Sequence, residues 1–294
     1  MHPLIDRRRM GRCTRAWIVV IASLGLAACN QSQTKDALIV AQRGKATTQD
    51  VGEYYKTLAR EAKNDPFVLN LATENNIPLT DTDIKKGQQL SDEYAARAEV
   101  FGALSNLYDT LGQVAGKKPD DLQGAIGNLQ TAVKGLTGQT LSGVAGLPAD
   151  LVTGVVNKVT AFAFDMSRQH DLRKGNRDLE GIASTLDDLF TKEQGFYKAT
   201  EQPEIQQQFT LAERLVDSGL ALDADRLKEY VELTDIQVAP LPPTGPFKDA
   251  EIQRLKLQEP IAEAAAAHRC DGLKASLDNL VVAHTEFDQH QQIK

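Results

Sequence analysis

The 294-residue sequence is poor in cysteine and in aromatic residues. It has three cysteines, one tryptophan and 5% aromatic residues in all. Three cysteines cannot form a disulfide scaffold, and 25% charged residues beside 41% hydrophobic residues is ordinary for a globular chain. The composition therefore excludes a disulfide-stapled, collagen-like or disordered protein. The length allows one or two domains, each with a core of its own.

Common catalytic signatures are also missing. The sequence holds no G-x-S-x-G, no H-E-x-x-H and no Walker-type glycine-rich loop. Thr80–Asp83 superficially resembles the start of a calcium loop, but Lys85 and Lys86 stand where oxygen ligands are needed. We therefore predict no catalytic residue and no metal site. A catalytic site assembled from distant residues would leave no such signature.

The amino-terminal segment carries the strongest signal in the chain. Arginines at positions 7, 8, 9, 12 and 15 precede an apolar run from Ala16 to Leu26. This run is too short to span a bilayer but has the length of a signal-peptide core. It ends in Leu26-Ala27-Ala28-Cys29, which resembles the lipobox of bacterial lipoprotein precursors. The resemblance covers about the first 30 residues, and no family is recognised for the rest.

The lipobox implies cleavage between Ala28 and Cys29, attachment of diacylglycerol to the Cys29 sulfur and acylation of the new amino terminus. No other cofactor is expected. Two or three acyl chains hold a protein stably at a membrane without a spanning helix. In similar lipoproteins an aspartate directly after the acylated cysteine favours retention at the inner membrane. Asn30 stands at that position here, so we expect an outer-membrane protein that faces the periplasm. The alternative is an ordinary signal peptide with an incidental cysteine.

Loss of the leader changes the charge of the chain. Residues 1–28 contain five arginines and one aspartate, so 28 of 33 basic and 39 of 40 acidic residues remain, a net charge of −11. Nucleic-acid binding requires clustered Lys and Arg, and the mature chain has no basic block, so this function is disfavoured. The expected partners are the membrane, through the lipid, and a protein of the cell envelope.

Helical periodicity runs through nearly all of the mature chain, and no strand pattern is present. We predict an all-α fold, an elongated bundle of about five or six long amphipathic helices. The expected organisation is a signal peptide (1–28), a polar tether (29–36), a helical bundle (37–237), a proline-rich linker (238–246) and a C-terminal helix that packs on the bundle (247–294).

Local signals place several helix boundaries. Thr80–Asp83 predicts an N-cap for a helix that reaches about Val114, because carboxylates favour the positive end of a helix. Proline predicts that a first helix, 49–64, ends at Pro66 and that a later helix starts at Pro203 and runs towards Thr234.

The apolar residues of 152–166 and of 179–189 point in opposite directions. Either the helix breaks within 167–176, or one long helix packs on different partners at its two ends. The absence of proline favours the second.

The segment 122–164 is unusually poor in charge and rich in glycine. Its apolar residues at 122, 126, 129, 133 and 136 have the 4-3 spacing of a bundle helix. The first interpretation is a tightly packed central hairpin, in which close helix approach offsets the cost of glycine. The alternative is a membrane-perturbing hairpin, comparable only in architecture with helical pore-forming proteins.

Two sets of polar residues are candidate sites in the core. Cys270 and His284 share the apolar seam of the last helix, and we interpret them as a buried thiol and a core histidine. They are 14 residues apart, about 21 Å along a helix, so they cannot share one metal ion. A second set, His170, Arg173 and Arg177, could interrupt the bundle core as a polar layer, and an enzyme would need its pocket there.

Overall fold

The computed structural model describes the chain in five principal helices: α1 (Met10–Ala72), α2 (Asp81–Ala115), α3 (Leu122–Thr137), α5 (Leu172–Asp217) and α7 (Pro246–Gln292). A further helix covers 153–162, and residues 80, 236, 238 and 245 are also described; in α1 the side chains are described from 34 to 67. No strand occurs in these parts of the chain. The predicted all-α helical bundle is therefore confirmed.

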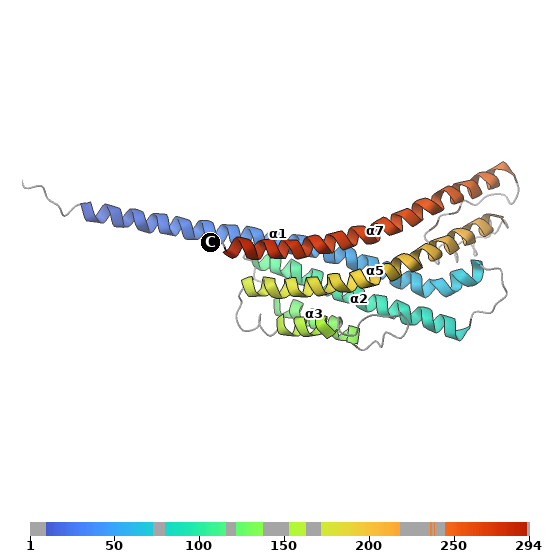
Figure 1. Ribbon diagram of the computed structural model, residues 1–294, viewed down its shortest axis with the longest axis horizontal. Coiled ribbons are helices and arrows are strands. Elements are labelled where there is room, and N and C mark those ends of the chain that lie inside the picture. Colours follow the sequence, from blue (N-terminus) through green and yellow to red (C-terminus); the bar gives the residue numbers. More distant parts are fainter. Residues whose placement is uncertain are drawn as a thin grey trace, which may run out of the picture.

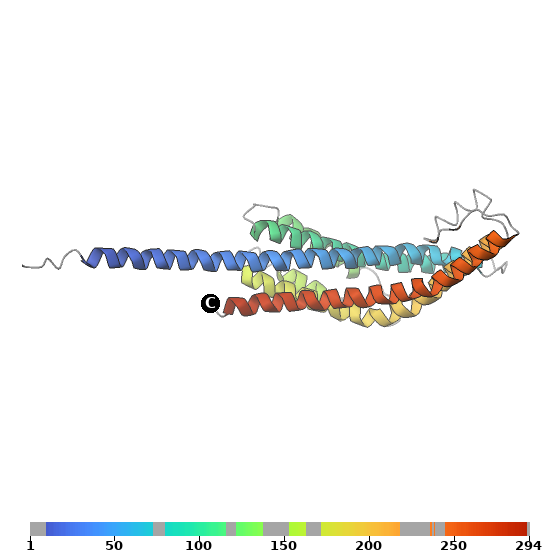
Figure 2. The ribbon, with the colours of Figure 1, turned by 90° about the horizontal axis from the view of Figure 1, so that it is seen from above.

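The long helices lie roughly along one axis, so the molecule is a rod (Figures 1 and 2). Each long helix is antiparallel to the partner on which it packs most: α1 packs chiefly against α2, and α5 against α7. The shorter α3 packs on α2. The N-terminal part of α1 projects beyond the other helices, past the end where α7 finishes.

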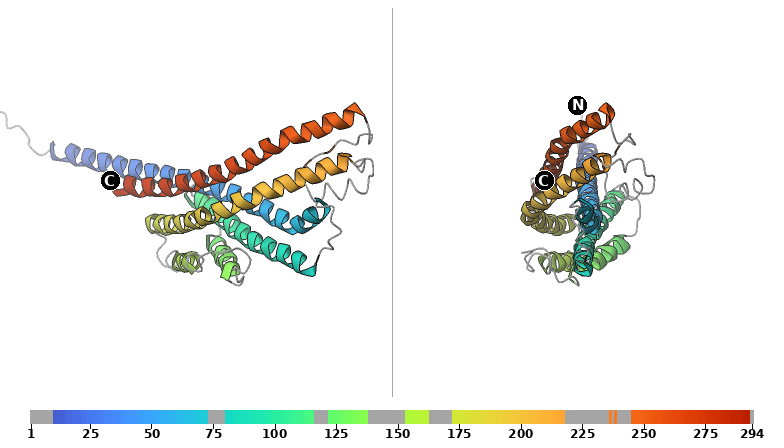
Figure 3. Two further views of the ribbon diagram at one scale, coloured as in Figure 1. Left: turned by 45° about the vertical axis from the view of Figure 1, so that its right-hand side comes forward. Right: turned by 90° about the vertical axis from the view of Figure 1, so that its right-hand side faces the viewer.

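At the opposite end the bundle is forked (Figure 3). The pair α1/α2 and the pair α5/α7 diverge towards the point where α1 ends and α7 begins. We call residues 201–217 of α5 with 246–267 of α7 the distal arm. It has a small core of its own, separate from the main one, formed by Phe209, Leu211, Ala212, Leu215, Val216, Val238 and Leu255.

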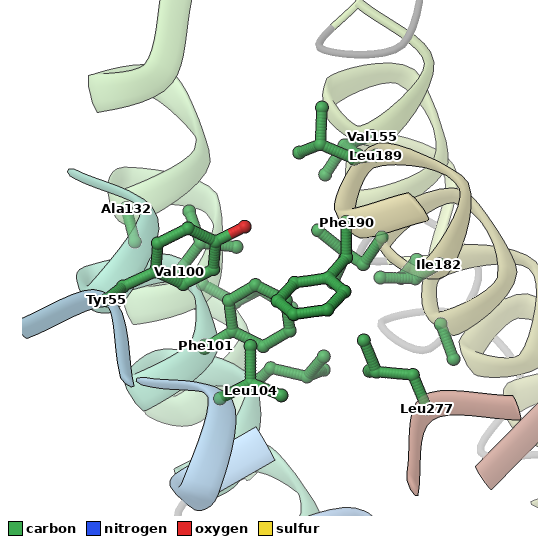
Figure 4. Close-up of a cluster of buried hydrophobic side chains, with 14 of the residues drawn as sticks. Tyr55, Val100, Phe101, Leu104, Ala132, Val155, Ile182, Leu189, Phe190 and Leu277 are labelled. Atoms are coloured by element: carbon green, nitrogen blue, oxygen red, sulfur yellow. The ribbon is translucent and has the colours of Figure 1, made fainter. Parts of the chain in front are cut away.

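The main core joins all the helices, as the close-up in Figure 4 shows. Tyr55 of α1 stacks on Phe101 of α2, with ring centroids 5.6 Å apart. Phe190 of α5 meets Tyr55 edge to face at 6.2 Å. Such contacts contribute about 0.5–1.5 kcal/mol each beyond the burial of their surface, so these rings hold α1, α2 and α5 together.

The N-cap predicted at Thr80 is confirmed. The Thr80 hydroxyl donates to the Asp83 carboxylate at 2.6 Å, and the Asp83 amide donates back to Thr80 Oγ1 at 3.3 Å. This exchange satisfies one of the free amides of the first turn of α2.

Both helix boundaries predicted from proline, an end at Pro66 and a start at Pro203, are wrong. α1 continues through Pro66 to Ala72, and α5 contains Pro203 in its interior. A proline inside a helix removes one backbone hydrogen bond and bends the helix, but packing on either side can outweigh that cost. α5 carries Pro203, α7 carries Pro260, and both helices are bent in Figure 1.

Other boundaries differ from expectation or lie outside the described residues. The expected tether 29–36 is helical and continuous with α1, since it holds neither glycine nor proline; Asp36 Oδ2 lies 3.8 Å from His290 Nδ1 of α7. The possible break in 167–176 falls largely on 163–171, which are not described. Of the linker 238–246, the described residues are Val238, which is buried, Gly245, and Pro246, which begins α7.

Candidate functional site

The predicted lipidation site lies on α1. The backbone at Ala28 and Cys29 is helical, and their side chains lie outside the described part of the chain. Of the predicted polar layer, His170 and the Arg173 side chain are likewise outside it. The Arg177 side chain is 54% exposed and its Nε donates to Asp288 Oδ2 at 2.6 Å. Arg177 therefore lies at the surface, and its neighbour Asn176 is the polar residue that enters the core.

Asn176 belongs to a buried chain of hydrogen bonds centred on His284. Tyr108 OH and His284 Nε2 are 2.7 Å apart, and His284 Nδ1 and Asn176 Oδ1 are 2.8 Å apart. Because Asn176 Oδ1 can only accept, Nδ1 carries the proton and Nε2 accepts from Tyr108. Burial lowers the pKa of His284 to about 4, partly opposed by Asp288. The histidine is therefore neutral at physiological pH.

The space beside this chain is small. A cavity of about 40 Å³ touches Tyr108, Asn176 and His284, and its other lining residues are apolar or glycine. Such a volume holds a water molecule and excludes an organic substrate. The His284 network therefore ties α2, α5 and α7 together as a structural element.

Cys270 is a buried free thiol, as the sequence suggested. Burial, with the Glu201 carboxylate as the next cause, raises the pKa of the thiol to about 11. A thiol in this state is unreactive, because the thiolate is the nucleophile and the metal ligand. Across the described residues no cluster of His, Cys, Asp and Glu has the arrangement of a metal site.

The most enclosed ion pair joins Arg97 of α2 to Glu193 of α5. Their side chains are 4% and 2% exposed, and Arg97 Nη2 lies 2.8 Å from Glu193 Oε1. Tyr55 OH donates to Glu193 Oε2 at 2.8 Å, and Tyr197 OH donates to the same oxygen. Burial would lower the pKa of Arg97, but the Glu193 carboxylate outweighs it, so the pKa is raised and the guanidinium stays charged.

Sequence reasoning missed this pair, although a signal exists. Arg97 occupies a core position between Tyr94 and Phe101, at spacings of three and four residues, and Glu193 occupies one between Phe190 and Tyr197. Two opposite charges on the apolar faces of two helices indicate a buried partnership.

Carboxylates gather where the fork opens. Burial raises the pKa of Glu204 to about 9, with further increments from Asp65, Glu61 and Glu201. Burial also raises the pKa of Glu201, partly opposed by Tyr54 and by the positive charge of Arg269. This end of the molecule therefore has an excess of closely spaced acidic groups.

The distal arm also exposes large apolar side chains. Phe247, Leu257 and Ile261 of α7 are 72%, 69% and 67% exposed, more than any other large hydrophobic residue described. A groove of about 370 Å³ lies next to Ile261 between α5 and α7, lined by Lys198, Glu201, Gln202, Pro260, Glu263, Ala264, Ala266 and Ala267. The forked end thus combines an apolar strip with acidic groups.

The segment 122–164 is described over 122–137 and 153–162. Its apolar residues there are buried in the main core, among them Ile126, Leu129, Val155 and Phe162. A Cβ added at Gly127 or Gly135 would meet nothing within 4 Å, so close helix approach does not account for these two glycines. Among the residues that the structure describes, no helix combines the length and the apolar character needed to cross a membrane.

Comparison with known proteins adds no relative: no family model matches the chain, and no curated protein or solved structure is significantly similar to it. The fold itself defines the class, an elongated all-α bundle with a forked end.

Proposed function

We propose that this protein is a lipid-anchored helical binding or scaffold module of the bacterial envelope, held at the outer membrane and facing the periplasm. The lipobox Leu26–Cys29 and the following Asn30 support the anchor and its location. The acidic mature chain, with no basic block, favours a protein partner over nucleic acid.

The observation that carries the proposal is the continuity of α1. One helix runs from Met10 through Cys29 to Ala72, so the acylated residue would lie at one end of the rod and the fork at the other. From Cys29 to Ala72 an α-helix is about 65 Å long. An anchored molecule of this shape presents its forked end far from the membrane surface.

The body between these ends is built to hold its shape. The Arg97–Glu193 pair and the His284 network each connect helices that are distant in sequence. Buried ion pairs of this kind fix which helices pack together more than they add stability. A rigid body with exposed apolar side chains at its far end suits a module that holds a partner.

The alternative, membrane perturbation by 122–164, requires Leu129, Val155 and Phe162 to leave the main core, where they are fully buried. For that reason we place the binding function first.

The test is crosslinking in living cells, followed by affinity purification of the protein from detergent-solubilised membranes. The Cys29→Ser variant is the control, since it removes the lipid and leaves the bundle unchanged. We expect a stoichiometric envelope protein with the wild type that is lost or depleted with Cys29→Ser. The same recovery from both forms would contradict a role for the anchor, and no partner from either would contradict the binding function.

A further inference from the structure

The α7 part of the distal arm has an apolar strip on its outer face. At 100° per residue, Phe247, Ala250, Leu257, Ile261 and Ala264 fall within about 100° of the helix circumference. All five are exposed. Most apolar side chains of the arm face the other way, into its small core, where Leu255 is completely buried. The strip is therefore additional to what folding of the arm requires.

The strip runs along the helix for several turns. From Phe247 to Ala264 it is about 26 Å long at 1.5 Å per residue. Arg254 lies within the same face, but its guanidinium is held by Glu251 on one side and by Gln258 on the other. Apolar anchors spaced in this way are what a partner helix contacts when it binds along a groove.

The groove beside the strip contains acidic residues. Lys198 lies at one end and is paired with Asp271 at 2.6 Å, which leaves Glu201 and Glu263 as the acidic lining residues. Glu201 is 6% exposed, and its carboxyl faces Tyr54, Cys270 and the positive charge of Arg269. Glu263 is only partly buried and accepts a hydrogen bond from Gln206 at 2.8 Å, so it is the carboxylate of the groove that a cation from a ligand can meet.

The sign of the charge decides between possible occupants. The distal arm contains eight acidic and four basic residues. Because burial raises the pKa of Glu204 to about 9, seven carboxylates are charged at neutral pH and the net charge is −3. Two such arms repel each other, which disfavours a second copy of this chain. An anionic lipid surface is disfavoured for the same reason. A basic partner is attracted.

We propose that the strip Phe247–Ala264 and the adjoining groove at Glu201 and Glu263 form a docking surface for a basic amphipathic helix of an envelope protein. The apolar face of that helix packs on Leu257 and Ile261, and a Lys or Arg beside it reaches Glu263. This inference rests on the proposed function, because it gives the chemistry of the partner held at the distal end.

The experiment places a photo-crosslinking amino acid at Leu257 in the full-length protein in living cells, with the same residue at Asn279 as the control. Both positions are exposed on α7, and Asn279 lies outside the arm. The crosslinked peptides are identified by mass spectrometry. We expect Leu257 to capture a peptide of another protein that has helical apolar spacing flanked by Lys or Arg, with no capture of that peptide from Asn279.

Charge is tested in the same cells. Replacing both groove carboxylates, E201Q with E263Q, is expected to lower the crosslink yield at least threefold. The matched change E286Q, an exposed glutamate elsewhere on α7, leaves the yield unchanged. Capture of a second copy, of lipid, of residues 218–235 of this chain or of a peptide without basic residues overturns the proposal, as does no capture at all.

Failure of the two proposals is distinguishable. If the wild-type protein purified from membranes carries no lipid on Cys29, the lipid-anchored function is wrong, whatever Leu257 captures. If the anchor is confirmed but Leu257 captures no basic helix, the docking surface alone is wrong.

Discussion

Gly44 of α1 faces the ring of Tyr108 of α2 at very short range. A Cβ at position 44 would lie 2.4 Å from Cδ1, 2.5 Å from Cε1 and 2.6 Å from Cγ of that ring. The ring is buried and its hydroxyl is bonded to His284 at 2.7 Å, so a shift of the ring away from position 44 disturbs this hydrogen bond. We therefore predict that Gly44→Ala destabilises the protein, even though alanine is the better helix former.

Two opposing contributions set the magnitude. Alanine gains up to about 1 kcal/mol over glycine inside a helix. Overpacking a filled core costs about 1–3 kcal/mol. Because the clash at 2.4–2.6 Å is with a buried ring, the cost falls in the upper part of that range, about 2–3 kcal/mol. The net loss in the free energy of unfolding is then about 1–2 kcal/mol.

The matched control is Gly102→Ala in α2. A Cβ there meets nothing within 4 Å, so the propensity gain is unopposed and stability rises by about 0.5–1 kcal/mol.

The assay is urea unfolding of both variants and of the wild type, followed by circular dichroism. The two alanine variants should move the midpoint in opposite directions at an unchanged slope. If Gly44→Ala is as stabilising as Gly102→Ala, the close packing of α1 on the Tyr108 ring is wrong, and with it the support that this ring gives to His284.

Three further predictions concern buried charge. Arg97→Met leaves Glu193 without its counter-charge and should cost about 3–5 kcal/mol, much of which the double variant with Glu193→Leu recovers. The folded-state pKa of His284 is about 4, against 6.5 when unfolded, so stability should fall by up to about 3 kcal/mol from pH 6.5 to 4, and His284→Gln should lack this component. The folded-state pKa of Glu204 is raised to about 9, so its contribution to stability is complete below about pH 4.5 and falls as the pH rises to 9. The Glu204→Gln variant, which needs no proton, should therefore be about 2 kcal/mol more stable than the wild type at pH 7.

All three are measured by chemical unfolding across pH. Equal stability of Arg97→Met and its double variant would mean that Glu193 is hydrated rather than buried. An unchanged acid-side slope in His284→Gln would contradict a neutral, enclosed imidazole. A Glu204→Gln variant that gains nothing at pH 7 relative to pH 4.5 would contradict the crowding of carboxylates at the fork.

Local signals in the sequence predicted the features that depend on a few neighbouring residues. The N-cap at Thr80 was predicted because hydroxyl and carboxylate side chains bond to the backbone beside them. The 4-3 spacing of apolar residues from Leu122 to Leu136 predicted α3, because it places them on one face of a helix. Pro66 and Pro203 misled the prediction, since the local cost of proline is known from sequence but the packing that outweighs it is not.

The buried sites depended on contacts between distant residues. The burial of His284 could be predicted from its place on the apolar seam of α7, but its partners Tyr108 and Asn176 lie 176 and 108 residues away. Arg97 and Glu193 stand 96 residues apart, and only the relative register of α2 and α5 brings them together. Sequence spacing could show that each charge occupies a core position, but it could not pair them.

The central claim is that Cys29 is the acylated amino terminus of the mature protein. Its most direct test is mass spectrometry of the amino-terminal tryptic peptide from purified membranes. The account predicts a peptide Cys29–Lys35 that begins at Cys29 and carries the mass of a diacylglyceryl group and an N-acyl chain. A peptide in which residues before Cys29 remain attached, with an unmodified thiol, would contradict it.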